Sequence, residues 1–126
     1  MNQQCLGIDW GTKRIGLALG NAETKLASPL GSVESLDALL DIVKKEKIEH
    51  LVIGLPLHSE GQDKALDSHF KGFLEALEAE SGLSVTSIDE RFTSQAADKL
   101  MGKTSRDGKR DAVAAMIILQ SYFDSL

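Results

Sequence analysis

The chain begins with an apolar hairpin pattern, Cys5-Leu6-Gly7-Ile8-Asp9-Trp10-Gly11-Thr12-Lys13-Arg14-Ile15-Gly16-Leu17-Ala18-Leu19, around which we expect the rest of the fold to be organised. Two apolar runs flank Gly-Thr-Lys-Arg, a pattern typical of a β-hairpin. The carboxylate of Asp9 stands near the end of the first run, where a strand ordered on both sides holds a side chain more rigidly than a loop does. A metal-binding carboxylate needs such rigidity. We therefore interpret Asp9 as the anchor of a small catalytic site to which the rest of the chain brings further acids.

The rest of the chain alternates apolar runs with segments of helical periodicity. The expected elements are an edge strand over 25–28 that ends at Pro29, a helix capped by Ser35, a strand over 51–55, a helix over about 63–81 that ends at Gly82, a strand over 83–89, a short helix from Thr93 or Ser94 to near Gly102, a loop from Gly102 to Gly108, and a final helix from Arg110 to about Tyr122. This order predicts an α/β fold with a mixed five-stranded sheet, in which an antiparallel hairpin and an edge strand precede parallel strands and helices cover both faces. We expect residues 1–126 to form one domain.

Composition limits the possible location and the kind of metal site. The chain has 126 residues, of which 42% are hydrophobic and 26% charged, as in ordinary globular domains. No apolar run approaches the roughly 18–20 residues that span a bilayer, and the first residues lack a signal-type pattern, so we expect a cytoplasmic protein. Cys5, the single cysteine, is expected to be buried and inert. His50, His58 and His69 lack ligand spacing and are expected to be solvated or locally hydrogen-bonded, so oxygen atoms must hold any metal, which favours magnesium or manganese.

Charge is unevenly distributed along the chain. The net charge of −5 argues weakly against a nucleic-acid partner, because phosphate binding requires positive charge. From Arg91 to Arg110, however, six cations stand against two anions, a local balance of +4. This basic segment fits either one edge of a phosphate-binding surface or a solvated charged loop.

Acidic residues are expected to converge at the carboxyl ends of the parallel strands, where ligands gather in sheets of this kind. These are Asp9, the pair Asp89-Glu90 and Asp111, and strand alternation allows only one of the pair to face Asp9. Three carboxylates in one pocket repel unless a multivalent cation joins them. Two magnesium ions about 3.5–4 Å apart can activate water and stabilise the leaving oxygen in phosphodiester hydrolysis. The cations that would contact the phosphates are Lys13, Arg14, Arg91, Lys109 and Arg110.

Each acid also has a simpler interpretation. The Asp9 carboxylate would then only accept hydrogen bonds from backbone N–H groups of the following turn. Glu90 could pair with Arg91 or Lys99 at the surface. Asp111 stands in the first turn of a helix, where the helix dipole favours an anion. Spacing alone leaves these alternatives open.

Four motifs stand in order along the chain: Gly7-Ile8-Asp9-Trp10-Gly11 with Lys13-Arg14-Ile15-Gly16, Ile53-Gly54-Leu55-Pro56-Leu57 with Gly61, Asp89-Glu90-Arg91-Phe92-Thr93, and Lys109-Arg110-Asp111-Ala112-Val113-Ala114-Ala115. With these motifs the chain resembles the YqgF/RuvX family from about Leu6 to Phe123. Members of that family are described both as Holliday-junction resolvases and as pre-16S ribosomal RNA nucleases, and they have the RNase H-like fold. This sequence has Trp10, His58 and Phe92 where the family often has other residues, and none of these departures removes an acid.

The resemblance implies a metal-dependent endonuclease in which Asp9, Glu90 and Asp111 form an acidic triad that binds one or two Mg²⁺ or Mn²⁺ ions. It further implies processing of the 5′ end of precursor 16S ribosomal RNA, with ribosomal precursor particles as partners. Cleavage of branched DNA at Holliday junctions is the alternative activity. The oligomeric state is left open.

Two other classes of protein share part of this pattern. Asp9-Trp10-Gly11-Thr12 resembles the opening of the phosphate-binding hairpin in sugar kinases and actin-like ATPases. Those proteins resemble two such domains closing over ATP, whereas this chain supplies one. A nucleic-acid-binding module without catalysis is the second rival, and the presence of all three acids argues against it.

Overall fold

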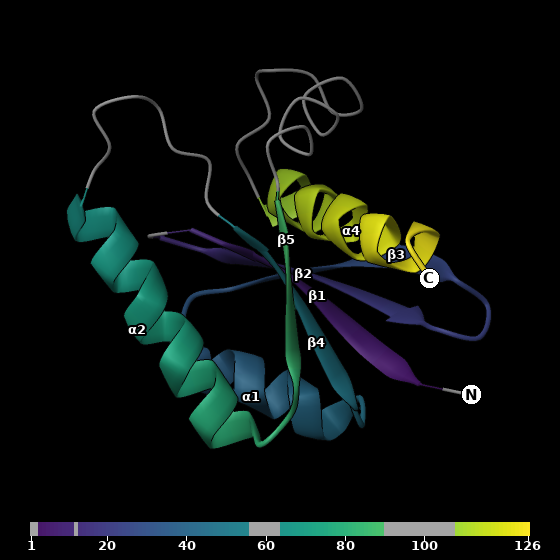
Figure 1. Cartoon of the computed structure of the whole chain (residues 1–126), viewed down its shortest axis with the longest axis horizontal. Helices are drawn as coiled ribbons and strands as arrows, with labels where there is room; N and C mark the ends of the chain where they lie inside the picture. Colours follow the sequence, from purple (N-terminus) through teal and green to yellow (C-terminus); the bar gives the residue numbers. More distant parts are fainter. Residues whose placement is uncertain (1–2, 12, 56–63, 90–107) are drawn as a thin grey trace.

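The computed structural model describes residues 3–11, 13–55, 64–89 and 108–126. Its elements are, in chain order, β1 (Gln4–Trp10), β2 (Ile15–Asn21), β3 (Leu26–Val33), α1 (Leu36–Lys45), β4 (His50–Leu55), α2 (Lys64–Ser81), β5 (Val85–Asp89) and α4 (Gly108–Asp124). The strands form one sheet in the order β3-β2-β1-β4-β5 (Figure 1). Pairing is antiparallel between β1, β2 and β3, and parallel between β1, β4 and β5. The predicted mixed five-stranded sheet is therefore confirmed.

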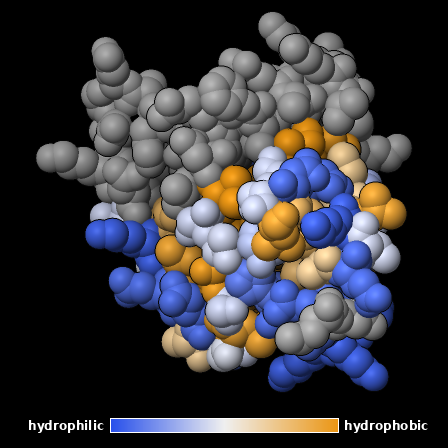
Figure 2. Space-filling model, turned by 45° about the vertical axis from the view of Figure 1, so that its right-hand side comes forward, coloured by the Kyte–Doolittle hydropathy of each residue, from blue (hydrophilic) through white to orange (hydrophobic). Residues whose placement is uncertain are grey.

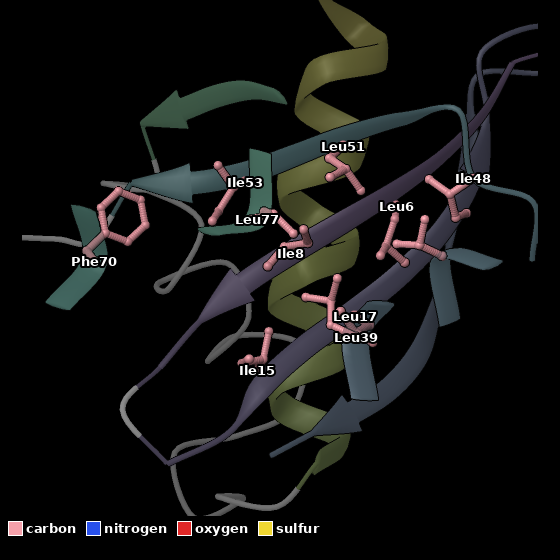
Figure 3. Packing of buried hydrophobic residues seen from close by; sticks show 11 residues of the cluster. Leu6, Ile8, Ile15, Leu17, Leu39, Ile48, Leu51, Ile53, Phe70 and Leu77 are labelled. Atoms are coloured by element: carbon pink, nitrogen blue, oxygen red, sulfur yellow. The ribbon is translucent and has the colours of Figure 1, made fainter. Parts of the chain in front are cut away.

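One face of the sheet, here called the α1/α2 face, carries the larger hydrophobic cluster. Leu6 and Ile8 of β1 point to this face together with Leu51 and Ile53 of β4 (Figure 3). Buried side chains of α1 and α2, among them Leu39 and Leu77, pack against them. The β1 residues alternate with a period of two, so Cys5, Gly7 and Asp9 point to the opposite face.

That opposite face, here called the α4 face, is built from small residues. A methyl group on Gly7 would lie 2.7 Å from both the Ala115 carbonyl oxygen and the Leu119 Cβ, and one on Gly20 would lie 2.6 Å from the Phe123 ring. Since real Cβ atoms do not approach so closely, the glycines are what allow α4 to lie directly on β1 and β2. Helices thus cover both faces, as predicted (Figure 1).

Two helix ends follow the sequence signals. The Ser35 side chain accepts a hydrogen bond of 3.1 Å from the Ala38 N–H, as an N-cap does. Gly82 adopts a φ of +68° after α2, the left-handed conformation that commonly ends helices. Both predictions are confirmed.

The prediction that Pro29 ends the edge strand is wrong, because β3 continues to Val33. The Ala27 N–H and the Lys25 carbonyl bond to the Gln120 side chain, at 3.1 and 2.8 Å, so this part of β3 directs polar backbone groups away from β2. Period-two alternation turns the Pro29 nitrogen the same way, and its missing N–H costs no ladder hydrogen bond. Beyond Pro29 the pairing of β3 with β2 continues after a register shift between Leu17 and Ala18.

The final helix begins at Gly108, two residues before the expected start. The expected helix from Thr93 or Ser94 to Gly102, residues 102–107 of the expected loop, and His58 lie outside the described residues. None of the helices in the described ranges is long and apolar enough to cross a membrane. On the face shown in Figure 2, hydrophobic residues are interspersed with hydrophilic ones.

Candidate functional site

The candidate site lies at the edge of the sheet where the parallel strands end. The parallel pairing of β1 with β4 and of β4 with β5 brings their carboxyl ends to one edge. Asp9 is the penultimate residue of β1 and is partly buried there. Its neighbours Ile8 and Trp10 both pack on the α1/α2 face, Trp10 with its ring centroid 5.5 Å from that of Phe70. Alternation therefore directs the Asp9 carboxylate to the α4 face.

Asp111 reaches the same place from the other end of the sequence. It lies in the first turn of α4, and its backbone rests on Gly16 of β2. A Cβ on Gly16 would lie 2.9 Å from the Asp111 Cβ and in hard contact with the Asp111 carbonyl group. A side chain at position 16 would therefore exclude Asp111 from its observed position.

Gly16 also fixes the distance between the two acids. It is the register partner of Asp9 in the antiparallel β1–β2 pair, and Cβ positions of such partners lie about 4.5–5.5 Å apart on the same face. The Asp111 Cβ, 2.9 Å from the Cβ position of Gly16, is then within about 8 Å of the Asp9 Cβ. Two carboxylates from Asp9 and Asp111, 102 positions apart in sequence, therefore share one small region of the α4 face.

An arginine accompanies these two acids. Arg14 lies in the connection between β1 and β2, and its Nε donates to Asp111 Oδ2 at 2.7 Å. The Arg14 side chain is 40% exposed and the Asp111 side chain 20% exposed. The connection itself is tight, because a Cβ on Gly11 would lie 2.7 Å from the Arg14 carbonyl oxygen. The hairpin thus supplies both Asp9 and the cation that pairs with Asp111.

The other predicted site residues are described only in part. Lys13 is exposed beside Arg14. Lys109 and Arg110 lie in the first turn of α4, so the helix start carries them to the same edge as Asp111. Glu90 and Arg91 lie outside the described residues, and Glu90 directly follows Asp89, the last residue of β5. Within the described ranges no group of three or more acidic, histidine or cysteine side chains could hold a metal ion.

The donors present fit a hard divalent cation. Asp9 and Asp111 supply only oxygen ligands, which Mg²⁺ and Mn²⁺ prefer. The guanidinium of Arg14 already places one positive charge beside Asp111. The two described acids therefore form part of a suitable ligand set.

Two titratable groups whose pKa values are shifted, Cys5 and His50, lie at the opposite end of the parallel strands. Cys5 and His50 are register partners near the starts of β1 and β4. Burial, with a smaller contribution from Glu49, raises the pKa of the Cys5 thiol to about 11. Burial lowers the pKa of His50, whose Nδ1 lies 2.7 Å from the Ser84 hydroxyl and whose Nε2 lies 2.8 Å from the Thr86 hydroxyl. Cys5 is buried and His50 is locally hydrogen-bonded, as expected, and both lie away from the candidate site.

Sequence reasoning gave Gly16 no role, although the structure makes it the contact point of the site. A glycine inside a strand pattern is the available signal, since it indicates a close approach of another backbone. The sequence contains this signal in Ile15-Gly16-Leu17. It does not identify which backbone approaches.

Comparisons with known proteins place the chain among nucleases. The model of a family described as RuvX, Holliday junction resolvase, matches residues 3–125. A protein of Nitrosospira multiformis, named as a candidate pre-16S rRNA nuclease, is 38% identical over 130 residues, which cover 94% of this chain and 86% of that protein. A protein of Shewanella denitrificans with the same name is 35% identical over 136 residues, which cover 99% and 96% of the two chains.

Solved structures share the fold at low sequence identity. RuvC of T. thermophilus, solved in complex with a Holliday junction substrate, matches with a TM-score of 0.63 at 16% identity, covering 98% of this chain and 94% of that one. The Fowlpox virus resolvase, solved with its substrate Holliday junction DNA, matches with a TM-score of 0.61 at 13% identity, covering 98% of each chain. These likenesses concern the RNase H-like α/β fold. From the family match and the curated relatives, the chain belongs to the RuvX family.

Proposed function

We propose that this chain is a metal-dependent endonuclease that hydrolyses phosphodiester bonds of nucleic acid, with residues 1–126 as one RNase H-like domain. One observation carries the proposal: Asp9 and Asp111, from opposite ends of the sequence, lie on the same face at the carboxyl edge of the sheet. Two carboxylates so placed repel each other unless a cation neutralises them. The repulsion between these carboxylates lowers the stability of the fold, whereas a bound metal ion would use both as ligands.

Glu90 is proposed as the third acid. It directly follows Asp89, and β5 runs parallel to β4 and β1, so the chain leaves this strand at the edge that holds Asp9. When bound, one or two Mg²⁺ or Mn²⁺ ions would activate water and stabilise the leaving oxygen. The part played by the chain is to hold its carboxylates on a rigid strand and a helix start, so that they need no rearrangement.

The basic residues are proposed to position the nucleic-acid backbone. Lys109 and Arg110 lie at the N-terminus of α4, where the helix dipole disfavours cations and favours anions such as phosphate. Their charges therefore oppose helix stability and serve phosphate binding instead. The exposed Lys13, together with Arg14 and Arg91, would extend the same surface.

Precursor 16S ribosomal RNA, within ribosomal precursor particles in the cytoplasm, is the substrate we favour. The curated relatives at 38% and 35% identity carry names of that activity. The description of the matching family favours a second candidate, cleavage of Holliday junctions. Membership of this family also favours hydrolysis over the ATPase and binding-only interpretations.

A cleavage panel with Mg²⁺ or Mn²⁺ tests the proposal. The probes are RNA that contains the precursor sequence before mature 16S ribosomal RNA, and a four-way DNA junction. Asp9→Asn and Asp111→Asn should each abolish cleavage and leave the circular dichroism spectrum unchanged. Asp37→Asn is the control, because Asp37 also lies in the first turn of a helix but is exposed and far from the candidate site in sequence.

The control separates the metal site from the helix dipole. If Asp111 serves only the helix dipole and its ion pair with Arg14, Asp111→Asn will lower stability but neither variant will reduce cleavage. Cleavage of either probe at the parent rate by Asp9→Asn would refute the metal assignment.

A further inference from the structure

Arg14 and Asp111 form an ion pair across 97 positions of sequence, at the centre of the candidate site. Arg14 Nε lies 2.7 Å from Asp111 Oδ2, the distance of a charge-assisted hydrogen bond. The Arg14 side chain, at 40% exposed, remains within reach of solvent. Pairs this open to water are weak, because solvent screens them. The ion pair therefore has good geometry, but another cation could replace Arg14 at Asp111 at a small cost in free energy.

A divalent cation and the Arg14 guanidinium would compete for the same carboxylate. The two species repel each other, and Oδ2 of Asp111 is already engaged by Arg14. Resting on the proposed function, we propose that Arg14 is a displaceable counter-ion: it holds Asp111 in the metal-free protein, and metal binding releases it to contact a substrate phosphate.

The geometry explains why such a counter-ion is useful. Without a cation, Asp9 and Asp111 would face each other's negative charge on the α4 face, at a Cβ separation within about 8 Å. Arg14 comes from the short connection that directly follows β1, so one hairpin positions the metal ligand Asp9 and neutralises its neighbour. The site then stays assembled while it waits for metal.

The chemistry of arginine suits both states. Its planar guanidinium presents donors in a fork that matches carboxylate and phosphate alike. Exchange of Asp111 for a phosphate oxygen therefore costs Arg14 no hydrogen-bonding capacity. Substrate contact by Arg14 becomes conditional on metal binding.

Calorimetric titration of the full chain with Mn²⁺, without nucleic acid, tests the competition. Arg14→Gln should bind Mn²⁺ about two- to fivefold more tightly than the parent, because an exposed ion pair contributes up to about that factor. Lys13→Gln is the matched control, since it removes the neighbouring exposed cation without breaking the pair. Its Mn²⁺ affinity should stay near that of the parent, because screened charges act weakly at a distance.

The outcomes separate this inference from the proposed function. Equal or weaker Mn²⁺ binding by Arg14→Gln, or equal tightening by Lys13→Gln, overturns the counter-ion role while leaving the nuclease proposal intact. Absence of saturable Mn²⁺ binding by the parent overturns both.

A second measurement needs no folded variant for its main result. In a nitrogen–proton correlation spectrum, the Arg14 Nε–H signal of the parent should shift on titration with Mg²⁺, as its bond to Asp111 breaks. As a complement, Arg14→Gln should weaken binding of the precursor RNA probe, relative to the parent, more in Ca²⁺ than in chelator. A signal that stays fixed at saturating Mg²⁺ overturns the displacement.

Discussion

Replacing Gly16 by alanine should separate Asp111 from Asp9 without removing either acid. The added Cβ would lie 2.9 Å from the Asp111 Cβ, whereas ordinary contacts begin at 3.4 Å, so the start of α4 must move by at least about 0.5 Å. The Asp111 carbonyl group lies even closer to this Cβ position, so relieving that contact requires a larger movement of α4. Displacements of about 1 Å in a catalytic site can cost about a hundredfold in rate. We therefore expect cleavage to fall about ten- to a hundredfold, with a stability loss of about 1–3 kcal/mol.

Two glycines provide matched controls for this experiment. Gly72→Ala should stabilise the chain by about 0.5–1 kcal/mol and leave cleavage unchanged, because Gly72 is an exposed residue of α2 and no described atom outside its own stretch of helix lies within 4 Å of its Cβ position. Gly20→Ala disturbs α4 at its far end, where the Cβ would meet the Phe123 ring at 2.6 Å. It should lose stability with a much smaller loss of activity than Gly16→Ala.

Urea unfolding and initial cleavage rates at saturating Mg²⁺ give the two readouts. If folded Gly16→Ala cleaves at the parent rate, cleavage does not depend on the position of Asp111. The same conclusion follows from an equal loss of activity in Gly20→Ala at equal stability, because activity would then follow general packing rather than the position of Asp111.

Three further predictions concern the rest of the fold. Burial lowers the pKa of His50 below its value in the unfolded chain, so as pH falls the unfolded state takes up the proton first. The free energy of unfolding should therefore fall as pH drops through about 6.5. Urea titrations at pH 8 and pH 5.5 should show this dependence in the parent and its loss in His50→Gln. Cys5, with its pKa raised from 9.0 to about 11, should have about a hundredfold less thiolate at pH 8 than the unfolded chain, which comparison of alkylation rates with and without urea will check. Gln120→Ala removes the partner of two backbone groups on the edge of β3, the Ala27 N–H and the Lys25 carbonyl. Sedimentation should then detect more self-association, and urea unfolding should show a stability loss of about 0.5–1.5 kcal/mol. For each of these three predictions, an unchanged value would contradict the physical cause given.

Local signals in the sequence were enough to predict the architecture. The hairpin around Asp9 follows from two apolar runs about a tight turn, and the helix ends follow from Ser35 and Gly82. The prediction that β3 ends at Pro29 is wrong because proline does not terminate every strand. Its tolerance depends on which way the backbone of an edge strand faces, and that is decided by long-range pairing.

The candidate site was predicted only in outline. Strand ends and a helix start identified Asp9 and Asp111 as neighbours, because parallel topology gathers such ends at one edge. The pairing of Arg14 with Asp111 was not predicted, because strand topology brings elements to one edge without specifying which of their side chains meet. The role of Gly16 depends on how closely α4 approaches the sheet, and this depends on the packing of the whole α4 face.

Anomalous diffraction from a crystal soaked in Mn²⁺ will show whether Asp9 and Asp111 hold a metal ion together. We expect an anomalous peak on the α4 face from an ion that is coordinated by carboxylate oxygens of both aspartates, at bond lengths of about 2.0–2.1 Å, as for Mg²⁺. A well-occupied crystal without a peak there, or with Mn²⁺ bound to neither aspartate, would contradict this expectation.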